Sequence, residues 1–348
     1  MVGTLGSLLL AVGCAGPAAT ATQAPAAPPA PNAAPAAPAA PIRVTLASAA
    51  VSLGMAPILV ARSKSFFAEE GIDLDWQLLQ GAPMVAAGVS SGDVQLGNGS
   101  AADVIGLSAR NVPVLAVEAH TQKMLFDVIA RRDLARERGL SPDLPLRDRI
   151  VGLHGARMGV TSAGGPPDRY WRWLTTQGGF APDDVETVRV GSPPEIRTAF
   201  RQGQIDGTLS TPPAGPQLEQ EGIGIVLIRN RDVPEFGQFP HDALYATRSY
   251  AEEHPDAITR AARAIGRGSA LIQGNTAEAQ ALLRPEFKDV DPALVDRSVE
   301  LVKDAFSTDG RMTEEVWQNA MTVLVGSGAI FRALDTREGG LWTNRYLP

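Results

Sequence analysis

The chain has 348 residues, with 31 basic and 38 acidic side chains, a net charge of −7 and one cysteine. The acidic balance argues against a nucleic-acid partner, because nucleic-acid phosphates call for a clustered basic surface. One cysteine excludes a disulfide framework, and with only four histidines it argues against a thiolate zinc site, so no metal is expected. Beyond the first ~14 residues, no apolar run approaches the ~20 residues that a membrane-spanning helix needs.

The first 41 residues carry no charged side chain. Residues 5–14 form a short apolar run that ends in small residues and a cysteine, which is typical of a secretory signal peptide. Residues 11–14, Ala-Val-Gly-Cys, resemble a bacterial lipobox, in which the cysteine is lipidated and becomes the mature N-terminus. The sequence therefore predicts a signal peptide over residues 1–14 with lipidation at Cys14. A buried helix with a chance cysteine is the alternative.

The next segment, residues 15–41, contains 14 alanines and 8 prolines. Such a sequence buries nothing and favours an extended, solvated chain, which at ~3 Å per residue reaches roughly 80 Å. A lipidated cysteine followed by a stiff linker describes a domain that is held near a membrane without entering it. We therefore predict a periplasmic or cell-surface protein that is lipid-anchored to the membrane.

From residue 42 to residue 228, short β runs alternate with helical segments. Strands that alternate with helices indicate βαβ units and a mostly parallel sheet. About 300 residues exceed one typical core, so two domains or lobes are expected. The predicted strands cover residues 43–47, 72–79, 94–97, 114–119, 126–131, 157–161, 185–190, 206–210 and 223–228.

Helical patterns lie between the predicted strands and continue after them. Residues 57–70 are predicted to form a helix that Gly71 stops. After Tyr245 the pattern is helical only, with apolar stripes over residues 256–272 and 294–306. Thr313 is a predicted N-cap before an acidic first turn, for a helix that runs to about residue 325. These stripes are core packing and carry no functional assignment.

Two motifs resemble those of enzymes. Residues 97–102 match G-x-G-x-x-A after a strand, and Glu118 lies 21 residues beyond Gly97, at the spacing of a dinucleotide site. That fingerprint normally opens its domain, whereas here a full βαβ unit precedes it, and a tight turn before a helix explains the glycines as well. Residues 88–92 match G-x-S-x-G in helix-turn-strand order, the reverse of a nucleophile elbow. No cofactor and no catalytic residue are therefore predicted.

Four predicted strands end in small polar residues instead of ionisable ones. In an open α/β sheet, ligands bind at the C-terminal ends of the strands. After residue 161, glycines lead into a proline-started helix, whose free N–H groups suit an anionic or polar group. No acid–base pair joins these strand ends, so the arrangement favours binding over catalysis. The strand-end residues are Ser48, Asn98 and Ser100, Thr161 and Ser162, and Ser210 and Thr211.

Several segments resemble, in the same order, those of a family of substrate-binding proteins of bacterial ABC importers. Residues 66–74, FFAEEGIDL, look like the FF-x-x-E-G-L-x-V signature of proteins that bind aliphatic sulfonates, taurine, nitrate and thiamine pyrimidine precursors. Residues 157–162, RMGVTS, resemble the family's G-K-x-V-G-V segment, and residues 199–207, AFRQGQIDG, its A-L-x-x-G-x-V-D-A segment. The resemblance covers about residues 42–327.

The resemblance implies an α/β periplasmic-binding-protein fold of type II, a two-lobed venus flytrap with a mostly parallel sheet in each lobe. It implies lobe 1 at residues 42–122, lobe 2 at 123–241, and a return to lobe 1 with C-terminal helices at 242–348. A small polar or anionic ligand, of the sulfonate, nitrate, carboxylate or thiamine-precursor class, would bind between the lobes of a monomer and pass to an ABC permease. The ligand-binding positions carried over are Ser48, Ser52, Asn98, Ser100, Thr121, Thr161, Ser162, Gly164 and Ser210.

The sequence departs from the family in ways that leave the ligand open. The predicted pocket loops contain no Arg or Lys, so a strongly anionic ligand would rest on helix N-termini, which Arg169 could assist if it is not simply solvated. Glu118 and His120 could hydrogen-bond a neutral heterocycle or only end a strand. A ligand-sensing domain for a signalling partner is an alternative with the same fold. Relatives that synthesise the thiamine pyrimidine use a cysteine-rich motif, which this chain lacks, so the enzyme alternative is disfavoured.

Overall fold

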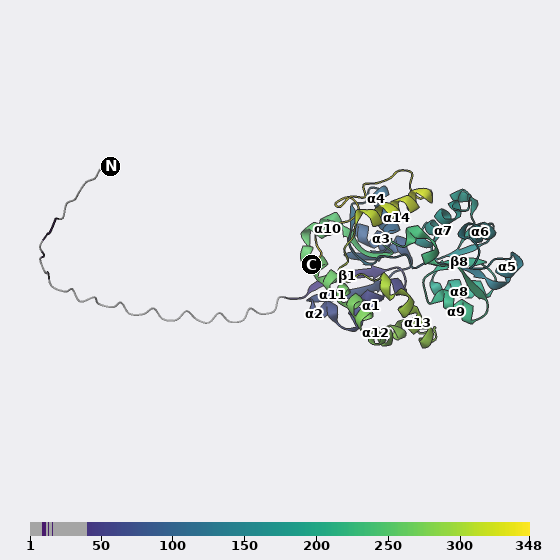
Figure 1. The fold of residues 1–348 in the computed structure, drawn as a ribbon, viewed down its shortest axis with the longest axis horizontal. Coiled ribbons are helices and arrows are strands. Elements are labelled where there is room, and N and C mark those ends of the chain that lie inside the picture. The colour runs from purple at the N-terminus through teal and green to yellow at the C-terminus, as the bar shows by residue number, and fades with distance from the viewer. Residues whose placement is uncertain (1–8, 12, 14–15, 17–39) are drawn as a thin grey trace, which may run out of the picture. The chain divides into compact units, whose positions relative to one another are not determined.

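Two five-stranded sheets organise the part of the chain that the structure describes (Figure 1). The computed structural model describes residues 9–11, 13, 16 and 40–348. Cys14 and most of the predicted signal peptide and linker lie outside the described residues. Residues 40–348 form one compact unit. Within the described part, no helix is both long and apolar enough to cross a membrane.

The first sheet is mostly parallel, with one strand in the opposite direction. Its order is β2-β1-β3-β10-β4, and β10 runs antiparallel to both of its neighbours. Its strands are β1 (Ile42–Ser48), β2 (Ile72–Leu78), β3 (Leu96–Gly99), β4 (Val114–Thr121) and β10 (Asp242–Thr247). The C-terminal ends of the four parallel strands and the first residue of β10 therefore lie at the same edge.

The second sheet repeats this arrangement. Its order is β7-β6-β8-β5-β9, and β5 runs antiparallel to β8 and β9. Its strands are β5 (Asp127–Arg131), β6 (Met158–Val160), β7 (Thr187–Arg189), β8 (Gly207–Ser210) and β9 (Gly224–Ile228). The predicted mostly parallel sheet in each lobe is thus confirmed. We call each sheet with its helices a lobe; the chain enters the second lobe after β4 and leaves it after β9.

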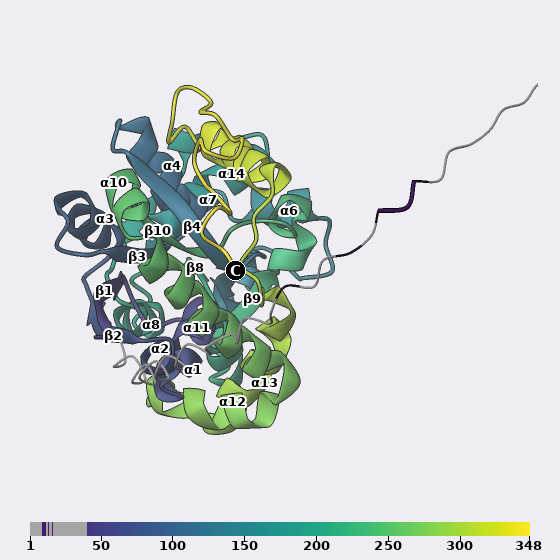
Figure 2. The same cartoon turned by 90° about the vertical axis from the view of Figure 1, so that its left-hand side faces the viewer.

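Helices cover both faces of the first sheet. On one face, Ile58 of α1 (Ala56–Ser63) and Ile265 of α11 (Pro255–Gly274) pack with Leu46 of β1. Figure 2 shows these two helices in its lower half. On the other face, Val85 and Val104 pack with Ala47. The first layer is α1 (Ala56–Ser63), α2 (Phe66–Glu69), α11 (Pro255–Gly274), α12 (Thr276–Leu283) and α13 (Pro292–Val302). The second layer is α3 (Ala82–Ser91), α4 (Ala101–Ala109) and α14 (Glu314–Gly326), and α10 (Arg248–Glu253) follows β10.

The second lobe has its own small core and shares a larger one. Phe200 and Leu218 pack with Ile129 on one face of the second sheet. On the other face, Trp173 belongs to a cluster that continues into the first lobe and includes Leu324. The helices are α5 (Arg132–Glu137), α6 (Leu146–Gly152), α7 (Pro166–Thr176), α8 (Pro193–Arg201) and α9 (Ala214–Gln220). The lobes are therefore joined by packed side chains as well as by the chain itself.

The observed elements depart from the predicted ones in two places. The helix predicted over residues 57–70 is divided into α1 and α2, because Ser65 adopts a left-handed φ of 61° that interrupts the helical backbone. The strand β10 was not predicted, and Tyr245 lies within it. Thr313 is the N-cap of α14, as predicted, and its side chain accepts a hydrogen bond from the N–H of Val316.

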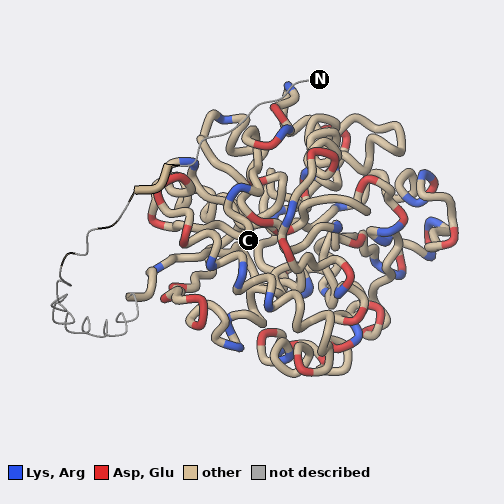
Figure 3. Tube along the Cα trace, turned by 60° about the vertical axis from the view of Figure 1, so that its left-hand side comes forward, with Lys and Arg blue, Asp and Glu red and all other residues tan. Residues whose placement is uncertain are grey.

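Charged residues of both signs are interspersed along the trace of both lobes (Figure 3). Many of them form ion pairs within their own lobe. Arg157 lies 2.9 Å from Asp206, and Arg284 lies 2.8 Å from Asp296. Such partly exposed pairs contribute about 0–1 kcal/mol each to stability, so they carry little of the fold.

Candidate ligand-binding site

The C-terminal edge of the first sheet carries two buried polar side chains, Ser48 and Asn98. Leu46 is opposite Leu96, and extending this register places Ser48 beside Asn98 on the same sheet face. Ser48 is 1% exposed and Asn98 is 7% exposed. Among the described residues, neither the Ser48 hydroxyl nor the Asn98 amide oxygen has a hydrogen-bond partner. A buried polar atom left unpaired costs about 1–3 kcal/mol, so a partner from outside the chain is expected at both.

The turn that leads into α1 is fixed to this edge. Ser52 is half-buried and precedes the 3-10 turn Leu53–Met55. The hydroxyl of Thr121, the last residue of β4, donates a hydrogen bond to the carbonyl oxygen of Gly54 at 2.6 Å. Thr121 thus positions the turn, and its hydroxyl proton is already used.

Ser100 begins α4, and its donors are engaged within the chain. Its N–H and its hydroxyl both donate to the Asp103 carboxylate, at 2.8 and 3.1 Å. Burial raises the pKa of Asp103, against the opposing effects of these hydrogen bonds and of Arg169. Ser100 therefore stabilises the start of the helix.

The two enzyme-like motifs have structural explanations. A β-carbon at Gly97 would lie 2.5 Å from the ring carbon Cζ of Tyr245, and one at Gly99 would lie 3.1 Å from its Cε1. The glycines of the G-x-G-x-x-A motif thus give space to this ring. The G-x-S-x-G motif lies at the C-terminal end of α3, where Gly92 adopts a left-handed φ of 86°. This is not the strand-turn-helix geometry of a nucleophile elbow.

The second lobe contributes the loop after β6. Ser162 is 8% exposed, and its hydroxyl has no partner among the described residues. Thr161 is half-buried, and Gly164, with a φ of 68°, donates its N–H to the Asp168 carboxylate at 2.7 Å. Asp168 lies in the first turn of α7 and also accepts from Arg172 at 3.0 Å. The helix start that the sequence suggested for an anionic group therefore already holds a carboxylate.

One loop lies between the strand ends of the two lobes. The N–H of Leu79 donates to the carbonyl oxygen of Ser48 at 2.9 Å. Two residues later, a β-carbon at Gly81 would lie 3.9 Å from the Cβ of Ser162. Ser210 ends β8, the neighbour of β6, and is half-buried. The loop after β2 thus meets both Ser48 and Ser162, each from its own lobe.

Tyr170 is a polar residue between the lobes that the sequence analysis missed. It lies on α7, and its ring centroid is 5.9 Å from that of Phe126 and 5.3 Å from that of Phe239. Burial raises the pKa of its phenol, and the nearby Ser100 opposes that rise. The Tyr170 hydroxyl has no hydrogen-bond partner within the described residues. In the sequence, the three-residue spacing of Tyr170 and Trp173 is typical of core packing and gives no sign of a site. Only the buried hydroxyl seen in the structure indicates one.

A buried ion pair lies near the end of β4. Nδ1 of His120 is 2.9 Å from Oε2 of Glu118, and both side chains are buried. Burial alone would lower the pKa of His120, but the charge and hydrogen bond of Glu118, with the charge of Asp242, raise it. His241 stays neutral, because burial and the neighbouring His120 lower its pKa to about 3. The Nε2 of His120 has no partner among the described residues.

Asp242 opens β10 at the same edge and was also missed from the sequence. Leu244 pairs with Asn98, so Asp242, two residues earlier, shares the sheet face of Asn98 and lies nearer the edge. Its carboxylate lies against the α-carbon of Gly54, where a β-carbon would stand. We call Ser48, Asn98, Asp242 and Ser162 the interlobe site.

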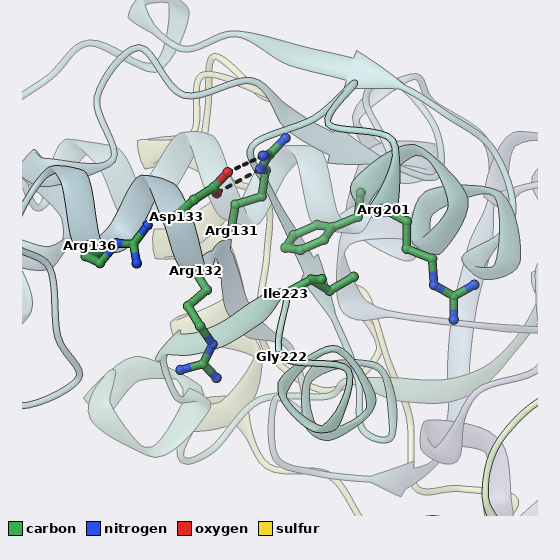
Figure 4. Close-up of a pocket in the computed structure, with 8 residues that line it drawn as sticks. Arg131, Arg132, Asp133, Arg136, Arg201, Gly222 and Ile223 are labelled. Atoms are coloured by element: carbon green, nitrogen blue, oxygen red, sulfur yellow. Dashed lines mark hydrogen bonds and ion pairs between the residues drawn. The ribbon is translucent and has the colours of Figure 1, made fainter.

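Two cavities lie away from the interlobe site. One, of about 260 Å³, is lined by Arg131 and by three further arginines (Figure 4). Arg131 pairs with Gly224 at the start of β9, so this cavity is at the opposite edge of the second sheet. Figure 4 shows the guanidinium groups pointing to different sides, and Arg131 and Arg201 are paired with Asp133 and Glu221. The other cavity, of about 330 Å³, lies between the end of α4 and the C-terminal segment.

The described residues contain no group of three or more His, Cys, Asp or Glu side chains arranged to hold a metal ion. The polar groups that the strand edges bring together are hydroxyls, one amide and one carboxylate. They can donate and accept hydrogen bonds to a small molecule.

Residues 53–279 match the model of the family described as NMT1/THI5 like. The chain belongs to this family. It is 24% identical to YtlA of Bacillus subtilis (strain 168) over 296 residues, which are 83% of this chain and 84% of YtlA. It is also 24% identical to the taurine-binding periplasmic protein of Escherichia coli (strain K12) over 216 residues, 61% of each chain.

A solved structure confirms the predicted fold of this NMT1/THI5-like protein. The alkanesulfonate-binding protein SsuA from Xanthomonas axonopodis pv. citri matches it with a TM-score of 0.68. The match covers 84% of this chain and 95% of SsuA at 14% sequence identity. The two-lobed periplasmic-binding-protein fold is therefore established, whereas the predicted ligand residues and lobe boundaries stay predictions.

Proposed function

We propose that the protein is an extracytoplasmic solute-binding protein that captures a small polar molecule between its lobes and delivers it to an ABC permease. The family and the fold support this proposal. In it, the strand-end residues predicted from the sequence face the ligand from both lobes, and no residue acts as a catalyst. Thr121 and Ser100 serve by fixing the turn before α1 and the start of α4.

The observation that carries the proposal is a set of three buried polar atoms that have no hydrogen-bond partner in the part of the chain that the structure describes. They are the Ser48 hydroxyl, the Asn98 amide oxygen and the Ser162 hydroxyl. Buried polar groups in native proteins are paired with protein, water or ligand in the great majority of cases. Two of the three belong to the first lobe and one to the second, so one molecule between the lobes would satisfy groups on both.

Such a ligand would favour the closed arrangement of the lobes. A molecule that touches only one lobe gains nothing from closure, whereas one that bonds to Asn98 and Ser162 gains contacts only when the lobes are together. Binding energy is thereby used to close the protein around its ligand. The closed form is the state that a permease would recognise.

Native mass spectrometry of the purified protein, followed by thermal unfolding with added ligands, tests this proposal. We expect a retained small molecule, or a melting shift with at least one of taurine, ethanesulfonate, nitrate and 4-aminopyrimidine. At a concentration 100 times the Kd, a ligand adds about 2.7 kcal/mol to the free energy of unfolding. Asn98→Ala should reduce the shift, whereas Ser90→Ala, on the exposed end of α3, should not. No retained molecule and no shift with any compound would remove the binding function.

The lipid anchor is a separate part of the proposal. The lipobox-like sequence before Cys14 and the Ala/Pro-rich segment after it support attachment to the outer side of a membrane. Cys14→Ser should release the protein from the membrane fraction of expressing cells. An unchanged distribution between the membrane and soluble fractions would contradict lipidation at this residue.

A further inference from the structure

Among the described residues, the edge of the first sheet carries unpaired hydrogen-bond acceptors beside groups that can also donate, such as the Nε2 of His120. The Asn98 amide oxygen can only accept, and the Ser48 hydroxyl can do either. The Asp242 carboxylate lies on the same face and has no hydrogen bond or ion pair among the described residues. A molecule that bonds to both Asn98 and Asp242 must therefore supply donors.

The electrostatic surroundings of Asp242 contain more acidic than basic groups. Burial raises the pKa of Asp242 to about 7; His120 opposes the rise, and Asp103 and Glu118 add to it. No lysine or arginine of the described residues is among the charges that act on it. His120 already faces Glu118, whose Oε2 lies 2.9 Å from its Nδ1. Apart from His120, the charged groups that act on Asp242 are acidic.

Two positions that an anion could use, an arginine of α7 and the start of that helix, are already engaged. Arg169, on α7, donates to the carbonyl oxygen of Ala102 at 2.7 Å and so links the two lobes. Arg172 donates to Asp168, whose carboxylate fills the start of α7 and accepts the N–H of Gly164. An anion placed against Asp242 would therefore meet a second negative charge without a neutralising cation, which is costly away from water.

We propose that the ligand of the interlobe site is a small nitrogen compound that donates hydrogen bonds and carries no negative charge, with Asp242 and Asn98 as its acceptors. This inference rests on the binding function proposed above and specifies its ligand class. It sets the chain apart from the taurine-binding and alkanesulfonate-binding proteins that share its family or fold. An N–H group of the ligand satisfies the amide oxygen of Asn98, and a cationic or polar N–H group pairs with Asp242.

The test compares nitrogen donors with anions on the full chain. The probes are propylammonium and 4-aminopyridinium as chlorides, and nitrate and ethanesulfonate as sodium salts, with binding measured by calorimetry at pH 5.5 and pH 8. We expect a nitrogen probe to bind and to bind more tightly at pH 8, because Asp242 ionises between the two pH values. Asp242→Asn should weaken that binding about tenfold and remove most of its pH dependence.

Asp73→Asn is the matched control, because it removes the same charge from an exposed position of β2 in the same lobe. Melting curves without ligand establish that each variant is folded. Native mass spectrometry should find that any retained molecule is a neutral or cationic nitrogen compound. Binding of nitrate or ethanesulfonate, a retained anion, or unchanged affinity in Asp242→Asn would overturn the inference while leaving the binding function intact. No binding and no retained molecule would remove both.

Discussion

Two of the contacts between the lobes have opposite chemical character. Where α7 meets α4 and α14, in the upper part of Figure 1, the contact buries aromatic side chains such as Trp173 and Trp317. Where α9 approaches α13, in the lower part, the contact is polar: the amide of Gln217 donates to the carbonyl oxygen of Asp289 at 3.1 Å. Arg197 lies 3.9 Å from the same aspartate. We call these the apolar contact and the polar contact.

The difference indicates which side of the molecule opens. Apolar area removed from water stabilises by about 25 cal/mol per Å², and one tryptophan buries roughly 200 Å². An exposed polar or ionic contact contributes only about 0–1 kcal/mol. Separating the lobes at the polar contact is therefore the less costly movement. We infer that the apolar contact stays closed while ligand enters from the other side.

The largest effect should come from breaking the apolar contact. Trp173 is 3% exposed, packs at 5.5 Å from the ring of Phe236, and lies against Gly326 of α14. Trp173→Ala should lower the free energy of unfolding by about 3–5 kcal/mol, because it leaves a cavity between the lobes. Urea denaturation monitored by circular dichroism measures this loss.

Phe331 provides the matched control for this substitution. Its side chain is 100% exposed, so Phe331→Ala removes an aromatic ring that contacts little. We expect a change within about 0.5 kcal/mol. If Trp173→Ala were as mild as this control, the apolar contact would not hold the lobes together.

A smaller, pH-dependent effect is expected at Asp242, which opens β10 at the edge of the first sheet. Its pKa of about 7 in the folded protein exceeds that of an aspartate in an unfolded chain, ~3.9. At this carboxyl the folded state therefore binds more protons between these values, and its contribution to stability falls as the pH rises from about 4 to about 7. Asp242→Asn should remove this loss. Its free energy of unfolding relative to that of the wild type should therefore rise by about 2 kcal/mol between pH 4 and pH 8, allowing for partial exposure.

Thermal and urea unfolding across that pH range measures the gain. Asp127, with a pKa of about 6, and His120, whose pKa is raised, lose stability in the same direction, whereas His241, whose pKa is lowered to about 3, gains stability as the pH rises to about 6.5. The contribution of Asp242 is therefore the difference in slope between Asp242→Asn and the wild type. Asp133 and Asp335, with pKa values of about 2, act only below about pH 4 and in the opposite direction. Asp73→Asn should keep the wild-type slope. An equal slope in Asp242→Asn would show that its carboxyl titrates as in the unfolded chain.

Much of the fold follows from local patterns in the sequence. Alternating strands and helices predict the two mostly parallel sheets, and Thr313 marks the start of α14 by its capping chemistry. Ser48, Asn98 and Ser162 were predicted as ligand-binding residues because parallel strands bring their C-terminal ends to one edge, a rule that needs no tertiary detail. Their contact with a ligand stays a prediction.

The missed features depend on distant pairing. The strand β10 lies between β3 and β4, more than 120 residues earlier in the chain, and its sequence Asp-Ala-Leu-Tyr-Ala-Thr has no strong strand pattern. Without β10, nothing in the sequence places Asp242 beside Asn98. The division of the first helix at Ser65 involves neither glycine nor proline at that residue, so no breaker announces it.

The smallest effect on stability, with the clearest consequence for opening, is expected at the polar contact. Gln217 accepts a hydrogen bond from Arg197 at 2.7 Å and donates one to Asp289, so it links α8 and α9 to the other lobe. Gln217→Ala should change the free energy of unfolding by no more than about 0.5 kcal/mol, because these groups are partly exposed to water.

The same substitution should nevertheless raise the population of open molecules. Small-angle X-ray scattering of the ligand-free protein should give a larger radius of gyration for Gln217→Ala than for the exposed control Gln204→Ala. A ligand that closes the lobes should then bind about two- to fivefold more weakly, because part of its binding energy restores the closed state. Unchanged scattering combined with a stability loss near that of Trp173→Ala would mean that the polar contact is as strong as the apolar one. The lobes would then have to separate elsewhere.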